Sequence, residues 1–264
     1  MISEKKKEEL KDKYVGLKIL NNQGCYMTIT NYNARRDIEV TFDDTFHTVV
    51  KGIDLNNFKR GAVNNPNYPT VYGVGISGSK YPKRGAKEYI TWHGIIERCY
   101  NEKSQKRDRY KTYIGCTACE DWLFYENFYD WIHSQDNFSK WLQGDFSIDK
   151  DIIQKGNKIY APDVSCLVPS YVNNLFTKHQ GARGNLPIGV DMNKYGTYNV
   201  SINNPLTKEH LHLGNFPTPE DAFYIYKKHK EQIIKDVAMK EYKEKNIIER
   251  CYESMMNYQV EITD

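Results

Sequence analysis

The sequence lacks any apolar run of 18 residues, the length that a membrane-spanning helix requires. Its lysine-rich start, residues 1–10, also lacks the apolar centre of a signal peptide. Cysteine is scarce, with six residues in a chain of 264, and no export signal accompanies them. We therefore expect reduced thiols, a cytoplasmic protein and no membrane partner.

Only one cysteine pair, Cys116-Thr-Ala-Cys119, has the spacing of metal ligands. A structural Zn²⁺ would need two further ligands, for which the nearest candidates are Cys99, Cys166 or His93. A single Cys-x-x-Cys string is a weak signal. Packed, inert thiols are therefore the default interpretation, and a structural zinc site is the alternative.

The chain also has little excess of either charge, because 37 Lys and Arg residues against 34 Asp and Glu residues give a net charge of +3. That total alone predicts no nucleic-acid partner. The distribution is more informative, since ten basic residues stand against four acidic ones between Lys80 and Lys111, with Tyr and Trp interleaved. This segment is a candidate phosphate-contacting surface. The alternative is a solvated helix and loop whose aromatic residues belong to the core.

The first 62 residues predict a sheet. Polar and apolar residues alternate in 26–32, 37–42 and 47–51, and Asn, Gly and Asp turns separate these segments. Such alternation is typical of half-buried antiparallel strands, which we expect to close as a small β-barrel. A stretch rich in Gly, Asn and Pro follows over 63–85. It predicts a linker or an extended arm, with a passive tether as the simpler alternative.

Residues 148–174 have the pattern of strand, polar turn, strand and helix, with Asp149, Asn157 and Asn173 as the polar residues at fixed places. This is the layout of a ββα-metal nuclease site, and the stretch resembles the HNH endonucleases of phage genomes. Two predicted helices upstream, 89–101 and 122–131, resemble the same group through their Trp, Phe and Arg-Cys spacing. The resemblance implies an HNH-like ββα-metal domain over residues 86–178.

The same resemblance implies roles for individual residues. Asp149 and Asn173 would bind one Mg²⁺ or Mn²⁺, and Asn157 would pin the catalytic loop. Lys150 stands where the best-known members carry the His that deprotonates water, so it is the candidate catalytic base. A lysine pKa of about 10.4 would have to fall by roughly three units for this task near pH 7. The alternative is an exposed strand end in which Asp149 and Asp151 form a local ion pair with Lys150.

A third segment, 187–240, predicts three short strands followed by a helix. Thr218 is suited to cap that helix, with Asp221 three residues further on. The segment resembles the Apetala-type, or ethylene-response-factor-like, DNA-binding domain through Gly189-Val190 and the strings at 213–216 and 220–222. In that family the sheet enters the major groove and the helix supports it from behind.

Alternation along these strands predicts which face is open. Apolar residues such as Val190, Met192 and Val200 would face the helix, which leaves a polar face towards DNA. The plant relatives carry Arg at the places of Asp191 and Asn193, so a different base preference is implied. The alternatives are a sheet that is merely polar, or a metal held by the two histidines. The predicted DNA-binding residues are Asp191, Asn193, Asn199, Ser201, Asn203, Lys208, His210 and His212.

The predicted fold class is therefore α+β and multidomain: small β-barrel, ββα-metal domain, three-stranded antiparallel sheet packed on a helix, and a helical extension over 241–264 for docking or dimerisation. These features predict a sequence-directed binder of double-stranded DNA, and a divalent-metal-dependent, homing-type HNH endonuclease in the cytoplasm of a bacterial host cell. Two alternatives stay open. One is a non-cleaving regulator in which Lys150 clamps a phosphate. The other is a phage protein that binds a host nucleic-acid-handling protein.

Overall fold

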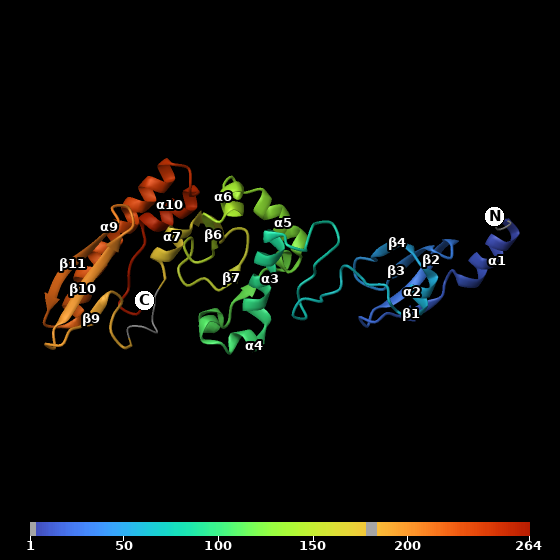
Figure 1. Cartoon of the computed structure of the whole chain (residues 1–264), viewed down its shortest axis with the longest axis horizontal. Helices are drawn as coiled ribbons and strands as arrows, with labels where there is room; N and C mark the ends of the chain where they lie inside the picture. Colours follow the sequence, from blue (N-terminus) through green and yellow to red (C-terminus); the bar gives the residue numbers. More distant parts are fainter. Residues whose placement is uncertain (1–3, 178–183) are drawn as a thin grey trace. The chain divides into compact units, whose positions relative to one another are not determined.

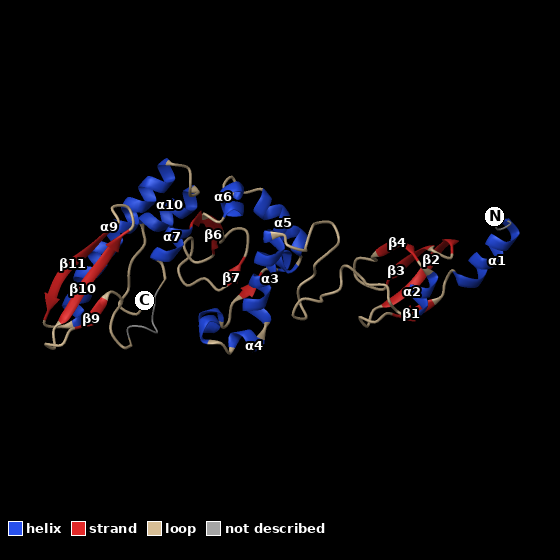
Figure 2. Cartoon of the chain, viewed as in Figure 1, coloured by secondary structure: helices blue, strands red, loops and turns tan. Residues whose placement is uncertain are grey.

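The computed structural model describes residues 4–177 and 184–264, without the side chains of Asp108 and Arg109. The ends of two predicted segments, residues 1–3 and residue 178, lie outside this part of the chain. Helices are combined with several small sheets (Figures 1 and 2), which confirms the predicted α+β class. The chain divides into two compact units, the first Met1–Ile114 with Glu120–Tyr129 and the second Gly115–Cys119 with Asp130–Asp264.

The first unit begins with a helix and a sheet of four consecutive antiparallel strands. Burial alternates along the two central strands, with Met27 and Ile29 on one strand opposite Phe42 and Val40 on the next. The predicted half-buried strands are therefore confirmed. The elements are α1 (Glu4–Tyr14), β1 (Lys18–Leu20), β2 (Tyr26–Ala34), β3 (Asp37–Phe42), β4 (Val49–Ile53) and α2 (Leu55–Lys59).

The predicted barrel is wrong, because this sheet is open. Its strand order is β1-β2-β3-β4, and in the part of the chain that the structure describes no pairing joins β1 to β4. With only three residues, β1 is too short to curl the sheet and close it. The apolar face is covered instead by Leu55 and Phe58 of α2, with Leu10 and Tyr14 of α1 packed against the same core. Two helices thus bury the apolar face that the opposite strands of a barrel would otherwise cover.

The Gly-, Asn- and Pro-rich segment after α2 is ordered against the first unit. Val63 is buried in the core of the sheet. The Asn65 side chain donates a hydrogen bond of 2.7 Å to Asp44, and the Tyr125 hydroxyl donates one of 2.6 Å to the Pro82 carbonyl. The segment is therefore a packed connection within this unit, with its backbone fixed at both ends.

The helices that follow confirm two predicted helical segments and place their aromatic residues inside. Trp92, Trp122, Tyr125 and Phe128 are fully or almost fully buried. The Trp92 indole nitrogen donates a hydrogen bond of 2.8 Å to the Trp122 carbonyl. These aromatics build the core and are not available to stack on nucleic acid. The elements are α3 (Lys87–Tyr100), α4 (Glu102–Gln105), η1 (Asp108–Tyr113), η2 (Glu120–Leu123) and α5 (Tyr125–His133).

The second unit contains three small sheets and the longest helix. The strands β6 and β8 form an antiparallel pair, β5 and β7 a short parallel pair, and β9 to β11 a three-stranded antiparallel sheet. These elements are β5 (Thr117–Ala118), α6 (Phe138–Gln143), β6 (Phe146–Asp149), β7 (Ile159–Tyr160), β8 (Cys166–Pro169), α7 (Ser170–Leu175), β9 (Val190–Met192), β10 (Tyr198–Asn204), β11 (Glu209–Phe216), α9 (Pro219–Lys243) and α10 (Glu249–Met256).

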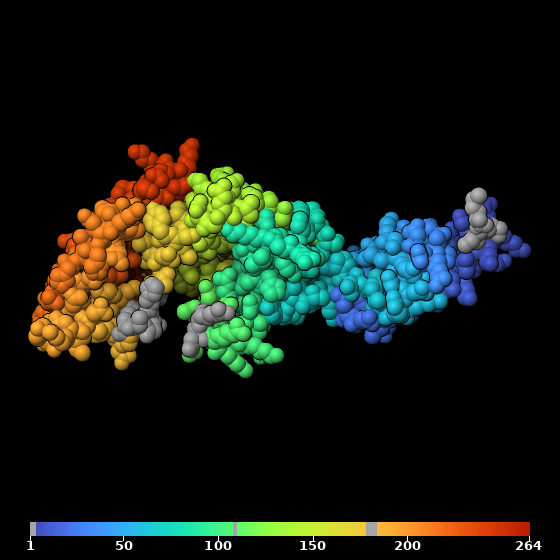
Figure 3. Space-filling view, in the orientation of Figure 1, coloured from blue at the N-terminus to red at the C-terminus, as the bar shows by residue number. Residues whose placement is uncertain are grey.

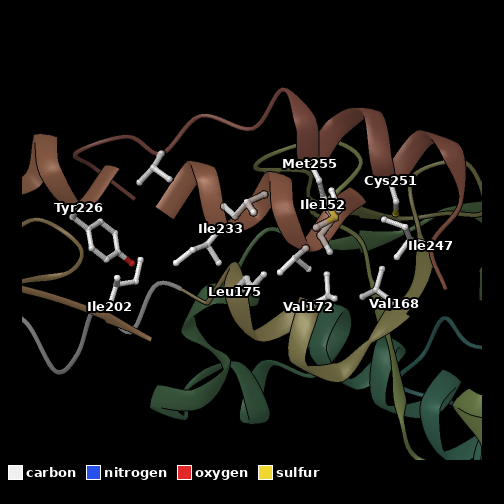
Figure 4. Packing of buried hydrophobic residues seen from close by; sticks show 14 of the residues in the cluster. Ile152, Val168, Val172, Leu175, Ile202, Tyr226, Ile233, Ile247, Cys251 and Met255 are labelled. Atoms are coloured by element: carbon white, nitrogen blue, oxygen red, sulfur yellow. The ribbon is translucent and has the colours of Figure 1, made fainter. Parts of the chain in front are cut away.

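One hydrophobic core joins the ββα elements of this unit to its three-stranded sheet (Figure 4). It joins Val168 and Val172 of the β8–α7 region to Ile202 of the three-stranded sheet, through side chains of α9 and α10. Residues 241–264, predicted as an extension, contribute Cys251 and Met255 to that core. Figure 3 shows α10, in red, at the surface of the unit beside α9. The helix pair α9–α10 thus shares a core with both the ββα elements and the three-stranded sheet.

Throughout the described ranges, no helix combines the length and the apolar character needed to cross a bilayer.

Candidate functional site

The predicted order of strand, loop, strand and helix is present at the centre of the second unit. Strand β6 ends at Asp149, which lies opposite Cys166, the first residue of β8. Helix α7 follows β8 without a break and packs against both strands. The hydroxyls of Ser147 and Ser170 are 3.0 Å apart and connect β6 to the first turn of α7.

Asp149 is a buried carboxylate with one oxygen in use. Its Oδ1 accepts hydrogen bonds of 2.7 Å from the backbone nitrogens of Asp151 and Ile152, which form the turn after β6. Its Oδ2 accepts none from the described residues. Burial raises the pKa of the Asp149 carboxyl, and the two backbone hydrogen bonds only partly oppose that rise. A carboxylate held in this way is better stabilised by a cation than by its present surroundings.

Lys150 is buried, and its ammonium group is fully engaged inside the protein. Its Nζ donates hydrogen bonds of 2.7 and 2.8 Å to the two carboxylate oxygens of Asp151 and one of 2.6 Å to the Asn157 carbonyl. It also lies 5.7 Å from the centre of the Tyr160 ring. Three donors are the full capacity of an ammonium group, so none is left for a substrate. The geometry favours Lys150 as a residue that holds the loop in place.

Asn157 closes the same loop from the other end. Its side-chain nitrogen donates to the carbonyls of Lys150 at 2.8 Å and Ile159 at 2.6 Å, and its oxygen accepts from the Ile159 nitrogen at 3.0 Å. The loop is therefore tied at both ends by one buried amide. This is the anchoring position that the resemblance implies, while any role of Asn157 in catalysis stays a prediction.

We expect the Asn157→Leu substitution to lower the free energy of unfolding by about 2–3 kcal/mol. The backbone carbonyls of Lys150 and Ile159 would lose the hydrogen bonds that the Asn157 side chain donates to them. Urea unfolding followed by tryptophan fluorescence would measure the change. Asn174→Leu, at an exposed position of α7, is the matched control and should be near neutral. Equal effects of the two substitutions would contradict the anchoring role.

Asn173 is the second residue that the resemblance assigns to a metal. It is half-buried on α7, and its side-chain amide has no hydrogen-bond partner among residues 4–177 and 184–264. One carboxylate and one amide oxygen, completed by water, are ligands that Mg²⁺ accepts. The unused oxygen of Asp149 and the unused amide of Asn173 therefore fit such an ion chemically.

The cysteines give no zinc site in the part of the chain that the structure describes, where no group of three or more His, Cys, Asp or Glu side chains is arranged to hold a metal. All six cysteines lie in the described ranges, and none of them forms a disulfide. A hydrogen bond with the Cys251 thiol, together with burial, raises the pKa of Cys166 well above its ordinary value. Cys166 is therefore a core residue, although it was a candidate zinc ligand.

The three-stranded sheet presents most of the predicted polar face. Val190, Val200 and Ile202 are buried towards α9. Six of the eight predicted residues lie on strands, where they form cross-strand rows. Met192 was predicted to face the helix, but its side chain is 63% exposed, so that prediction is wrong. The rows are Asp191 with Asn199, Ser201 with His212, and Asn203 with His210, whose ring lies 2.7 Å from the Asn203 oxygen.

The other two predicted residues lie in turns. Asn193 is held there because its side-chain oxygen accepts hydrogen bonds from the backbone nitrogens of Tyr195 and Thr197. Lys208 precedes β11 and has a left-handed backbone with φ of +61°. Both residues shape the ends of the sheet, where a long side chain such as that of Lys208 can still reach outwards.

Simple alternation missed Asn215, which lies opposite Asn199 and extends the polar row across all three strands. The register shifts between Val200 and Ser201, because β11 has an extra residue at Leu213. The bulge changes the side of the sheet on which later β11 residues stand. Two features of the sequence could have indicated it: Gly214 stands inside the strand, and the spacing of the apolar residues changes from two, between Leu211 and Leu213, to three, between Leu213 and Phe216.

The basic segment of the first unit uses part of its charge internally. Lys83 donates to the Ser77 hydroxyl at 3.2 Å, and burial lowers the pKa of Lys83. Arg98 donates to the Gly94 carbonyl at 2.9 Å and lies 5.1 Å from the Tyr113 ring centre. The predicted phosphate-contacting role of this segment stays a prediction.

Comparison of the chain with protein-family models found no match, and neither curated proteins nor solved structures matched it.

Proposed function

We propose that this protein binds double-stranded DNA and hydrolyses a phosphodiester bond with the help of Mg²⁺ or Mn²⁺, in the manner of the HNH endonucleases that it resembles. The observation that carries the proposal is Asp149. It is a buried residue at the end of β6, and its Oδ2 accepts no hydrogen bond from the described residues; the side-chain amide of Asn173 on the adjacent helix α7 has no partner among them either. Buried and incompletely satisfied carboxylates concentrate at functional sites.

In this proposal Asp149 and Asn173 hold the ion, which supplies Lewis-acid stabilisation of the charge that develops on the phosphate. Lys150 and Asn157 are positioning residues, since their hydrogen bonds fix the loop that follows Asp149. The polar face of β9–β11 contacts the DNA groove. Because the sheet and the ββα elements share one core, DNA bound to the sheet would lie on the same compact unit as Asp149.

A second candidate is a DNA-binding regulator that does not cleave. The full engagement of Lys150 favours it, because the place of the usual general base is occupied by an ammonium group with no donor or lone pair directed outwards. Both candidates use the same sheet for binding. They differ only in metal-dependent chemistry at Asp149.

The test is to incubate the whole protein with supercoiled plasmid and with host DNA in Mg²⁺, in Mn²⁺ or in EDTA. Wild-type protein should nick or linearise the DNA only with metal, and the Asp149→Ala, Asn173→Ala double variant should not. Asp163→Ala, which removes an exposed carboxylate from the same inter-strand segment, is the control and should cleave normally. A wild-type protein that shifts a DNA probe but never cleaves would establish the regulator.

A further inference from the structure

The second unit contains a cleft of about 520 Å³ whose lining includes neither Asp149 nor Asn173. Its walls come from α7, from β9 and the turn before it, from β10 and from α9. Leu175, Ile188 and Ile202 supply apolar surface. The polar residues of the lining that matter here are Asn174, Asp191, Ser201, Asn203 and Lys230.

Part of the lining is an open strand edge. Strand β9 pairs with β10 only from Tyr198 to Val200. Beyond Val200, the side of β10 that faced β9 borders the cleft instead, at Ser201, Ile202 and Asn203. The hydroxyl of Ser201 and the amides of Asn174 and Asn203 add hydrogen-bond donors around the same space.

Among the described residues, Lys230 supplies the only lysine or arginine side chain of the cleft lining. It is half-buried on α9, and neither a hydrogen bond nor an ion pair joins its ammonium group to the described residues. Burial lowers the pKa of Lys230 to about 8. The titratable groups that line the cleft with it are Asp191, Tyr171 and Tyr226, and the Tyr171 hydroxyl is already bonded to Glu241.

An amine placed in this way lowers the stability of the folded protein, because burial penalises its charge and no internal acceptor compensates it. Such a residue is expected where a ligand brings the counter-charge. The ligand must be an anion that also accepts hydrogen bonds, since the neutral polar groups of the lining include several donors. A phosphate group has both properties.

We propose that this cleft binds one phosphodiester group of a DNA strand, with Lys230 as its counter-ion and Asn174, Ser201 and Asn203 as hydrogen-bond donors. A phosphodiester carries one negative charge, which one lysine neutralises. A terminal phosphate carries close to two charges at neutral pH, and the carboxylate of Asp191 in the same lining disfavours the second one. The proposal rests on the DNA binding proposed above and not on cleavage.

The test is the salt dependence of DNA binding, measured by fluorescence anisotropy with a labelled duplex between about 0.05 and 0.2 M salt. Lys230→Gln should make the negative slope of log K against log salt shallower by about 0.9, which is the value of one lost phosphate contact. It should also weaken DNA affinity several-fold. Lys230→Arg should keep most of the slope. Lys228→Gln, an exposed lysine on the same helix, is the control and should behave as wild type.

The outcomes separate the two proposals. An unchanged slope in Lys230→Gln, with the fold confirmed by circular dichroism, would overturn the phosphodiester site and leave the nuclease proposal intact. The expected change of slope in a protein that does not nick plasmid would support the site and reject cleavage. A nucleoside monophosphate that stabilises wild type more than Lys230→Gln would assign the cleft to a free nucleotide and overturn the phosphodiester assignment. Complete absence of DNA binding would overturn both.

Discussion

The Asp149→Asn variant is expected to unfold at a higher temperature than the wild-type protein in EDTA and to lose metal-dependent nicking by more than about 100-fold. Mutation of a residue that only supports a metal ligand typically lowers metal affinity or activity about 10–100-fold. Asp149 is proposed as a ligand itself, so its loss should have a larger effect. The asparagine oxygen can still accept the backbone hydrogen bonds from Asp151 and Ile152. The variant removes a buried charge that the folded protein disfavours, so we expect a gain in stability. Thermal unfolding and plasmid nicking measure the two effects.

The sign of the stability change depends on pH. Burial raises the folded-state pKa of Asp149 above 3.8, so the ionised form is disfavoured in the folded protein. The stabilisation that this group gives is full below 3.8 and is lost as pH rises through the raised folded-state pKa. The advantage of the variant should therefore be present at neutral pH and vanish in acid. Added Mg²⁺ should raise the unfolding temperature of wild type more than that of the variant.

A matched control is Asp163→Asn, which neutralises an exposed carboxylate in the same segment between β6 and β8. It should change neither the unfolding temperature nor the nicking rate. If Asp149→Asn nicks DNA as fast as wild type, Asp149 holds no catalytic ion. If it unfolds at a lower temperature, its carboxylate stabilises the fold and the argument from burial fails.

Local sequence patterns were sufficient for individual elements. Alternating apolar residues identified β2 and β3, and the buried face observed in the structure is the predicted one. The helix cap at Thr218 is also as predicted, since its hydroxyl oxygen accepts a hydrogen bond of 3.1 Å from the Asp221 nitrogen. These features depend on contacts within a few residues, where geometry restricts the alternatives to a small number.

Patterns did not reveal what covers each buried face. Alternation shows that one side of the first sheet is apolar, but α2 and a barrel would cover that side equally well. The shared core of the second unit brings Val172 together with Ile202 and Cys251, which are distant in sequence. The three hydrogen bonds of Lys150 likewise depend on how the loop to Asn157 closes. Long-range packing decides such contacts, and no local pattern contains it.

The largest loss of stability is expected from Gly189→Ala. Gly189 precedes β9 with φ of +76°, and a Cβ atom there would lie 2.0 Å from a ring carbon of Tyr226. The backbone conformation costs an alanine about 1 kcal/mol, and displacing a buried ring adds about 1–3 kcal/mol. A total of roughly 3 kcal/mol is a large part of the stability of an ordinary domain. Urea unfolding of the whole protein would measure it.

Gly196→Ala separates the two causes. Gly196 lies in the turn between β9 and β10 with φ of +79°, and nothing lies within 4 Å of a Cβ atom placed there. The Gly196→Ala substitution should lower the free energy of unfolding only by the cost of the backbone conformation, about 1 kcal/mol. The difference between the two variants therefore reports the contact between Gly189 and Tyr226, which fixes β9 to α9 at the edge of the cleft containing Lys230. Equal losses in the two variants would show that the ring moves aside freely and that β9 is not held by this contact.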